Sequence, residues 1–316
     1  MPHPIDQRIT GKEHFIIFFK GMCMGVAEII PGISGGTIAF LLGIYQPFIQ
    51  SIRSINSQFV KHLLGLRIGD ALHTVAWKFL ALLFAGMLLA ILSLSHLLSW
   101  LIETHPTIIF SFFFGLILAT GPIIARIVDK WTPAKVLVFL ASGVATFFLV
   151  GMVPINTPDA PWFILLCGAV AISAMILPGI SGSFVLLILG KYHFILESVN
   201  QRDLVTIGVF VIGITVGILT FVRVLSWLFN KFHDMTLCVL TGFVLGSLNK
   251  IWPWKETIRT MPGRHGQLIP IEQVNHWPEI YNLYFFIALM AMILGFTLAI
   301  IFNRCHKDTF RGLNNP

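Results

Sequence analysis

Two stretches of the chain repeat each other and decide how it folds. The first is Pro31-Gly-Ile-Ser-Gly-Gly-Thr-Ile-Ala-Phe-Leu-Leu-Gly-Ile-Tyr45, and the second is Pro178-Gly-Ile-Ser-Gly-Ser-Phe-Val-Leu-Leu-Ile-Leu-Gly-Lys-Tyr192. They are 147 residues apart, and eight of their fifteen positions are identical. Such self-similarity at a fixed distance indicates an internal duplication. We refer to the two stretches as the first motif and the second motif.

The sequence around the motifs is that of a membrane protein. Of its 316 residues, 56% are hydrophobic and only 11% are charged, and the mean hydropathy is +0.85. A soluble domain of this size has too small an interior to bury so much apolar surface. Most of the uncharged stretches are long enough for a membrane-crossing helix of about 20 residues. They run over residues 29–52, 79–102, 104–125, 136–158, 160–190, 204–222 and 280–303.

Each motif interrupts one of these apolar stretches. Pro31-Gly32 and Pro178-Gly179 break a helix, because proline removes a backbone donor and clashes with the preceding turn. The helical arms around the first break are only about 24 Å and 20 Å long, short of the roughly 30 Å hydrocarbon core. These short arms favour two re-entrant hairpins, one formed by residues 15–45 and the other by residues 162–197. A single broken helix at each motif is the alternative. Unpaired backbone at such a tip must be buried in protein or face water, so we expect the tips to meet.

The remaining apolar stretches predict an all-α polytopic protein made of two inverted repeats, 15–153 and 162–302. Each hairpin is followed by three transmembrane helices, an odd number. If the hairpin returns to the side from which it entered, each repeat ends on the other side of the membrane, and the two repeats have opposite orientations. The predicted spans are about 77–102, 107–126, 135–153, 204–229, 235–250 and 281–302.

Basic residues orient this arrangement. Fourteen fall on the N-terminal side and six on the other, and Arg223 lies inside a span. Because basic residues collect in the cytoplasm, we expect both termini, 1–14 and 303–316, to be cytoplasmic in a bacterial inner membrane. An interfacial helix is predicted at about 48–70, and an external loop at 251–279. The net charge of +7 is assigned to topology, so no nucleic-acid partner is expected.

The two motifs are also the candidate binding site. A helix that starts after a break presents unpaired N–H groups and the positive end of its dipole, which favour an anion. Small residues that merely let helices pack are the structural alternative. The candidate phosphate ligands are Ser34, Gly35, Gly36, Thr37, Ser181, Gly182, Ser183 and the more distant Arg223.

Glu28 is an acidic residue three positions before the first break, and Met175 replaces it in the second repeat. A carboxyl group at membrane depth is a functional candidate, so Glu28 is assigned to coupling through H⁺ or Na⁺, or to gating. A structural ion pair or a cap on the tip of the other hairpin is the alternative. Lys20, Arg126 and Lys191 lie near helix ends, where a topological role is favoured over attraction of a headgroup.

Other chemistries lack their motifs. The eleven histidines are scattered without HExxH, and the four cysteines stand alone, so no metal or other cofactor is expected. There is no GxxxxGK[ST] sequence to bind ATP. Movement driven by an ion gradient, or passive movement, remains.

Gly25-Val-Ala-Glu-Ile-Ile-Pro-Gly-Ile-Ser-Gly-Gly-Thr37 together with Met175-Ile-Leu-Pro-Gly-Ile-Ser-Gly-Ser183 resembles the PopT family of undecaprenyl (polyprenyl) phosphate translocases. The resemblance extends over nearly the whole chain. It implies a flippase, not an enzyme, that recycles the polyprenyl phosphate carrier across the bacterial cytoplasmic membrane for peptidoglycan and other cell-wall polymers. One departure is Glu28, where the family commonly has Asp.

Two alternatives from other classes follow from the residues. An inorganic-anion channel or exchanger would use the same Gly and Ser helix starts to hold chloride or phosphate. A polyprenyl diphosphate phosphatase would need a nucleophile or base with nearby carboxylates or His. Neither motif contains a His, and the phosphatase is placed last.

Overall fold

The computed structural model describes residues 4–7, 11–128, 130–262, 268–278 and 282–305. Parts of the predicted cytoplasmic termini and of the predicted external loop therefore lie outside the described residues. The helices are α1 (Pro4–Gln7), α2 (Gly11–Ile29), α3 (Gly35–Leu41), α4 (Tyr45–Arg53), α5 (Ser57–Leu64), α6 (Ile68–Thr74), α7 (Trp77–Thr104), α8 (Pro106–Leu118), α9 (Thr120–Ala125), α10 (Pro133–Leu149), α11 (Pro161–Ile176), α12 (Gly182–Ile188), α13 (Tyr192–Gln201), α14 (Leu204–Lys231), α15 (His233–Gly246) and α16 (Leu283–Cys305). A 3₁₀ turn, η1 (Ser247–Asn249), follows α15, and two strands, β1 (Lys255–Pro262) and β2 (Leu268–Asn275), precede α16.

Among the described residues, four segments are long and apolar enough to cross a membrane. They are α7, α14, α16 and the α8–α9 segment Pro106–Ala125, and the bent pair α12–α13 adds a fifth if it is counted as one span. The apolar helices α10 and α11 are shorter, with 17 and 16 residues. The chain is thus an α-helical polytopic membrane protein.

The long helices pack in four pairs. α2 lies along α7 as α11 lies along α14, while α8 lies along α16 and α10 along α15. Small residues let helix backbones approach closely in membranes, where lipid removes most of the hydrophobic driving force. Glycines at each of these contacts have no room for a side chain against the neighbouring backbone, among them Gly86, Gly213, Gly246 and Gly295.

The chain turns back on itself at both motifs. α3 packs against α2, and α12 packs against α11. Gly32 and Gly179 have φ of +89° and +90° in the two breaks, a conformation that favours glycine. After the short helices, Gly43 and Gly190 repeat a left-handed φ of +70° and +65°. The duplicated sequence thus gives a duplicated backbone conformation.

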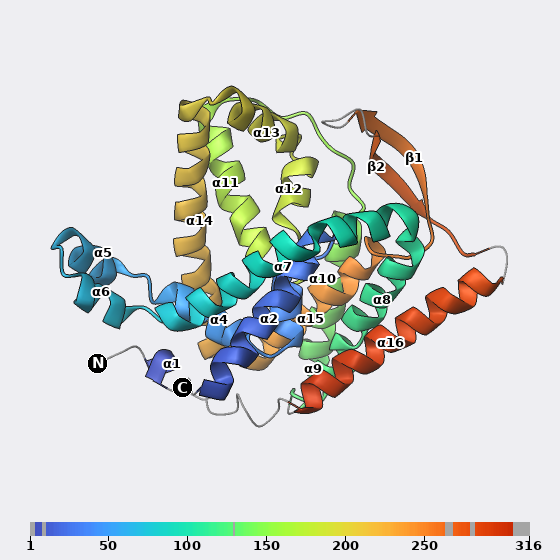
Figure 1. Cartoon of the computed structure of the whole chain (residues 1–316), viewed down its shortest axis with the longest axis horizontal. Helices are drawn as coiled ribbons and strands as arrows, with labels where there is room; N and C mark the ends of the chain where they lie inside the picture. Colours follow the sequence, from blue (N-terminus) through green and yellow to red (C-terminus); the bar gives the residue numbers. More distant parts are fainter. Residues whose placement is uncertain (1–3, 8–10, 129, 263–267, 279–281, 306–316) are drawn as a thin grey trace.

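The two ends of the molecule have different elements (Figure 1). α1, α4 and α9 lie at one end, which we call the α1 face, and α13, β1 and β2 lie at the opposite end, which we call the strand face. α2 starts at the α1 face and α11 starts at the strand face (Figure 1). The two hairpins therefore enter the molecule from opposite ends.

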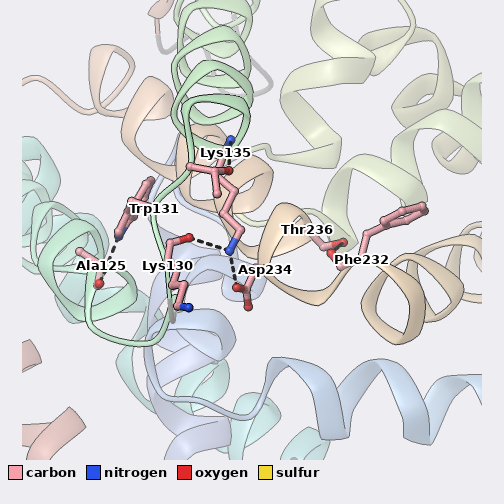
Figure 2. Close-up of polar contacts among 8 residues, drawn as sticks. Ala125, Lys130, Trp131, Lys135, Phe232, Asp234 and Thr236 are labelled. Carbon is pink, nitrogen blue, oxygen red and sulfur yellow. Dashed lines mark hydrogen bonds and ion pairs between the residues drawn. The ribbon is translucent and has the colours of Figure 1, made fainter.

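An ion pair joins helices of the two halves (Figure 2). The Lys135 Nζ at the start of α10 lies 2.6 Å from Asp234 Oδ2 at the start of α15, and it also donates to the Lys130 carbonyl. Both side chains are partly exposed, at 15% and 26%. The pair links the start of α10 to the start of α15.

Two segments differ from the sequence prediction. Three short helices, α4, α5 and α6, replace the single interfacial helix expected at about 48–70. The Asn56 side chain accepts from the backbone N–H groups of Gln58 and Phe59 and so starts a new helix, and Leu66, at φ +54°, ends it.

The predicted external loop 251–279 contains secondary structure. β1 and β2 pair antiparallel, with Lys255 opposite Asn275, and the register shifts between Thr257 and Thr260. This two-stranded sheet is an addition to the otherwise helical architecture that the sequence predicted. Its strands carry many polar and charged residues, which leave no clear alternating apolar pattern for a sequence-based prediction to detect.

Candidate functional site

The start of α3 is buried and fully capped. Ser34 is the N-cap residue, and its Oγ accepts from the Gly36 N–H at 3.1 Å. The Thr37 N–H donates to the Ser34 carbonyl at 2.9 Å. Ser34 and Thr37 are only 2% and 1% exposed. The backbone donors proposed for an anion in this motif therefore already have partners within the chain.

Glu28 caps the Gly35 donor at the start of α3. Its Oε1 accepts from the Gly35 N–H at 2.8 Å, and a Cβ on Gly35 would lie 2.8 Å from the same oxygen. A carboxylate at a helix N-terminus is favoured by the dipole and by the unpaired donors. Glu28 thus places a carboxyl oxygen at the position at which an anion was expected.

The second motif has a different cap, although its sequence is similar. Met175 replaces Glu28, and Ser181, the N-cap residue of α12, makes no capping hydrogen bond. Instead its Oγ lies 2.9 Å from the Ser183 Oγ. Ser183 is exposed, whereas Gly182 is buried, with its Cβ position 2.5 Å from the Ala171 carbonyl oxygen. The second motif therefore presents two hydroxyl groups where the first motif presents a carboxylate.

Direct hydrogen bonds join the two motif regions, which confirms the expectation that they meet inside the protein. The Gly179 N–H donates to Thr37 Oγ1 at 2.8 Å. The Ser34 hydroxyl donates to the Met175 carbonyl at 3.2 Å, and the Tyr45 hydroxyl donates to the Ile176 carbonyl at 3.1 Å. Gly36 is needed at this contact, because its Cβ would lie 2.9 Å from the Ile176 carbonyl oxygen.

The proline and glycine breaks differ in burial. Pro178 and Gly179 are buried, and a Cβ on Gly179 would lie 2.6 Å from the Phe243 carbonyl oxygen of α15. Pro31 is exposed, and Gly32 faces the side chain of Lys250. A Cβ on Gly32 would lie 3.1 Å from Lys250 Cγ. The second break is therefore embedded in the helices, while the first contacts a lysine near the strand face.

The other charged candidates have local partners. Lys20 is buried, and its Nζ donates to the Leu42 carbonyl at 2.7 Å, which caps the C-terminus of α3. Lys191 donates to the Thr157 carbonyl at 2.7 Å and pairs with Asp159 at 2.5 Å. Arg126 is an exposed residue at the end of α9. These positions agree with structural roles for Lys20 and Lys191.

Arg223 is not brought to the motifs by any hydrogen bond of the described residues. It is exposed on α14, and its guanidinium donates to the Leu219 carbonyl one turn earlier on the same helix. Lys250 lies against Gly32 instead and was not among the sequence candidates. The sequence placed it only among the six basic residues of the opposite side, because no local pattern links positions so far apart.

Fold and site together define a class of protein: a polytopic α-helical membrane transporter built around two joined helix-breaking motifs. The chain belongs to the undecaprenyl phosphate translocase-like family, whose family model matches residues 24–269. The family resemblance drawn from the motifs is therefore confirmed.

Two relatives are similar over most of their length. A polyprenyl-phosphate transporter of Vibrio cholerae is 39% identical over 272 residues, which is 85% of this chain and 88% of the relative. A polyprenyl-phosphate transporter of Staphylococcus aureus is 28% identical over 311 residues, which is 92% of this chain and 96% of the relative. No solved structure matches the chain.

Proposed function

We propose that this chain is a transporter of undecaprenyl or a related polyprenyl phosphate in a bacterial cytoplasmic membrane. It returns the lipid carrier from the outer to the cytoplasmic leaflet for peptidoglycan and other cell-envelope synthesis. Family membership supports this function, as do two relatives named as polyprenyl-phosphate transporters. The several apolar helices provide the membrane-embedded scaffold that movement of a lipid headgroup requires.

The proposed architecture is two inverted repeats, residues 15–153 and 162–302, each with a re-entrant hairpin and three transmembrane helices. The opposite entry of α2 and α11 into the molecule supports the inversion (Figure 1). The repeated φ values at the breaks support the equivalence of the hairpins. Both termini are cytoplasmic in this arrangement, so the strand face is external, and the two halves rock to expose the site to each leaflet in turn.

The proposed phosphate site is the contact between the two motifs, with Ser34, Gly35, Gly36 and Thr37 on one side and Ser181, Gly182 and Ser183 on the other. The observation that carries this proposal is the direct hydrogen bonding between the start of α3 and the end of α11 with the second break, since it joins one hairpin to the other. A site shared by both halves changes shape when the halves move relative to each other. Such a change is what alternating access requires.

Glu28 is the proposed gate. Its carboxylate and a lipid phosphate are both anions that accept from N–H groups, so they compete for the Gly35 N–H. Release of Glu28, by H⁺ or by Na⁺ taken up on the carboxylate, frees that donor for the phosphate. Coupling to an ion gradient follows from this exchange, because the substrate and the ion act on the same hydrogen bond.

Glu28→Gln and Glu28→Ala separate the charge from the cap. The glutamine keeps an acceptor for the Gly35 N–H, so we expect a folded protein that has lost gradient-dependent transport. The alanine leaves that donor without its acceptor, so unfolding should become easier by about 1–3 kcal/mol. Transport by Glu28→Gln with an unchanged gradient response would refute the gating role.

The test of the function is the accessibility of polyprenyl phosphate in the outer leaflet of proteoliposomes. A membrane-impermeant phosphate-binding probe reports redistribution, with and without imposed proton and sodium gradients. We expect protein-dependent redistribution, its loss in Ser181→Ala, and no loss in the control Ser93→Ala, whose hydroxyl only bonds its own helix. Full activity of Ser34→Ala, Ser181→Ala and Glu28→Gln would refute the site. An anion current without lipid redistribution would instead favour an ion channel.

A further inference from the structure

Two lysines close together in sequence, Lys250 before β1 and Lys255 at its start, have no carboxylate partner among the described residues. The ion pairs between side chains of the described residues are Lys135 with Asp234 and Lys191 with Asp159, and neither includes Lys250 or Lys255. Lys250 follows η1, and Lys255 begins β1, where its Nζ donates to the Lys250 carbonyl. Burial and the charge of Lys250 lower the pKa of Lys255 to about 7. Two neighbouring ammonium groups held partly out of water favour an anionic ligand.

The two lysines line a cavity of about 250 Å³ at the strand face. At about 30 Å³ for each water molecule, it has room for a phosphate group and several waters. Its other walls come from the segment after α10, from η1 and from β2. The Asn275 side chain holds β2 against η1, donating to the Asn249 carbonyl at 2.9 Å and to its Oδ1 at 2.6 Å. The cavity therefore has, beside the lysines, polar side chains held in place by hydrogen bonds.

An open apolar groove of about 400 Å³ adjoins this cavity, since Asn249 and Asn275 line both. Its lining is mainly aromatic and aliphatic and includes Phe114, Phe147, Trp252 and Trp277. The ring centroids of Trp252 and Trp277 are 5.1 Å apart, and those of Trp252 and Phe114 are 5.4 Å apart. Trp277 is 76% exposed. Together they give a cationic cavity beside an apolar groove.

We propose that this pair of pockets is a capture site for a polyprenyl phosphate at the strand face, separate from the contact between the motifs. Lys250 and Lys255 bind the phosphate, and the aromatic groove holds the first isoprene units of the tail. The charge and the apolar lining fit the two parts of one lipid phosphate. Inorganic phosphate would use the lysines alone, and an isoprenoid alcohol would use the groove alone.

Lys250 links this capture site to both hairpins. Its side chain lies against Gly32 of the first break, and its Nζ lies 4.5 Å from the ring centroid of Phe184 in α12. Lys255 is placed over the Phe110 ring at 4.6 Å. The inference rests on the proposed function, which makes the strand face external. It adds the position at which the headgroup is received before it reaches the two motifs.

The experiment measures binding to the full chain in lipid nanodiscs by calorimetry, with empty nanodiscs as the background. The probes are farnesyl phosphate, inorganic phosphate and farnesol. We expect farnesyl phosphate to bind more tightly than inorganic phosphate. Lys250→Gln and Lys255→Gln should each raise the Kd for farnesyl phosphate about tenfold or more, because each removes a charge-assisted hydrogen bond. The Kd for farnesol should not change.

Matched variants keep the test independent of folding. Lys255→Arg keeps the charge and should bind farnesyl phosphate nearly as tightly as the unmodified chain. Lys231→Gln is the control. Lys231 is the last residue of α14, where its ammonium group lies over the ring of Trp227, and it does not line the cavity. Trp252→Ala should raise the Kd for farnesyl phosphate and leave the Kd for inorganic phosphate unchanged. Thermal unfolding of each variant is measured in the nanodiscs, and only variants as stable as the unmodified chain are compared.

The outcomes separate this inference from the proposed function. Equal Kd values for Lys250→Gln, Lys255→Gln and Lys231→Gln would overturn the capture site, even if the unmodified protein redistributes polyprenyl phosphate in proteoliposomes. Equal affinity for inorganic and farnesyl phosphate would overturn the role of the groove. Absence of lipid redistribution by the unmodified protein would instead refute the proposed function.

Discussion

Of the two glycines at the breaks, Gly32 and Gly179, Gly179 is the one whose replacement with alanine should push the two motifs further apart. Gly179 has φ of +90°, where an L-residue is strained by roughly 1–3 kcal/mol. Its Cβ would also lie 2.6 Å from the Phe243 carbonyl oxygen, and this is backbone rather than the end of a flexible side chain. Relieving that overlap costs roughly a further 1–3 kcal/mol. Moving Gly179 also stretches its hydrogen bond to Thr37.

Gly43 provides the matched control. Its φ is +70°, but no heavy atom lies within 4 Å of its Cβ position. Gly43→Ala therefore has only the left-handed strain, roughly 1–2 kcal/mol. The structure thus predicts that Gly179→Ala lowers the free energy of unfolding by roughly 1–3 kcal/mol more than Gly43→Ala does.

The assay is equilibrium unfolding of both variants in the same detergent or nanodisc, followed by lipid redistribution in proteoliposomes. Gly179→Ala should lose transport even at temperatures at which it stays folded, because its motifs no longer meet as in the unmodified chain. Unfolding free energies for the two variants that agree within 0.5 kcal/mol, about the limit to which independent effects add, would refute this use of the backbone contact.

Three further predictions follow from single contacts. Thr37→Val should lower the free energy of unfolding by about 1–3 kcal/mol, because the buried Gly179 N–H loses its acceptor, while Thr37→Ser should keep it; calorimetric or denaturant unfolding checks this. The Kd for farnesyl phosphate should rise as the pH increases above 7, because Lys255, with its pKa lowered to about 7, loses the proton that an anion favours; titrations between pH 6 and 9 should show this rise, and Lys255→Arg should remove it. The Lys135–Asp234 pair is partly exposed, so a double-mutant cycle with Lys135→Gln and Asp234→Asn should give a coupling energy of only about 0.2–1 kcal/mol that falls with added salt, and a value above 2 kcal/mol would contradict this.

The parts of the fold that the sequence predicted are those set by local chemistry. Proline followed by glycine interrupts a helix whatever surrounds it, so both breaks were visible at Pro31 and Pro178. Long uncharged stretches likewise indicate helices of membrane length. The meeting of the motifs followed from a general requirement, since unpaired backbone inside a membrane needs partners. The Gly179–Thr37 bond meets that requirement.

The parts that were not predicted depend on distant contacts. Lys250 reaches Gly32 only because α15 brings the end of η1 beside the first break, and no sequence pattern relates the two positions. The β-strands lacked the clear alternation that would have separated them from a loop. The cap on α3 was missed for a related reason. Its donor, at Gly35, and its acceptor, on Glu28, belong to two helices that meet only after the chain has reversed direction.

That cap joins two predictions that the sequence presented separately. Glu28 was one candidate, and the backbone donors of Gly35 and Gly36 were another, but the structure binds the carboxylate to the donor. The second repeat has Met175 in place of the carboxylate, and its serine hydroxyls bond each other. Under the proposed function, a phosphate entering between the motifs meets one half that already holds an anion and one half that holds none. We propose that Glu28 leaves before the phosphate uses both halves, and that the difference between the repeats, rather than their similarity, is the transporter's point of control.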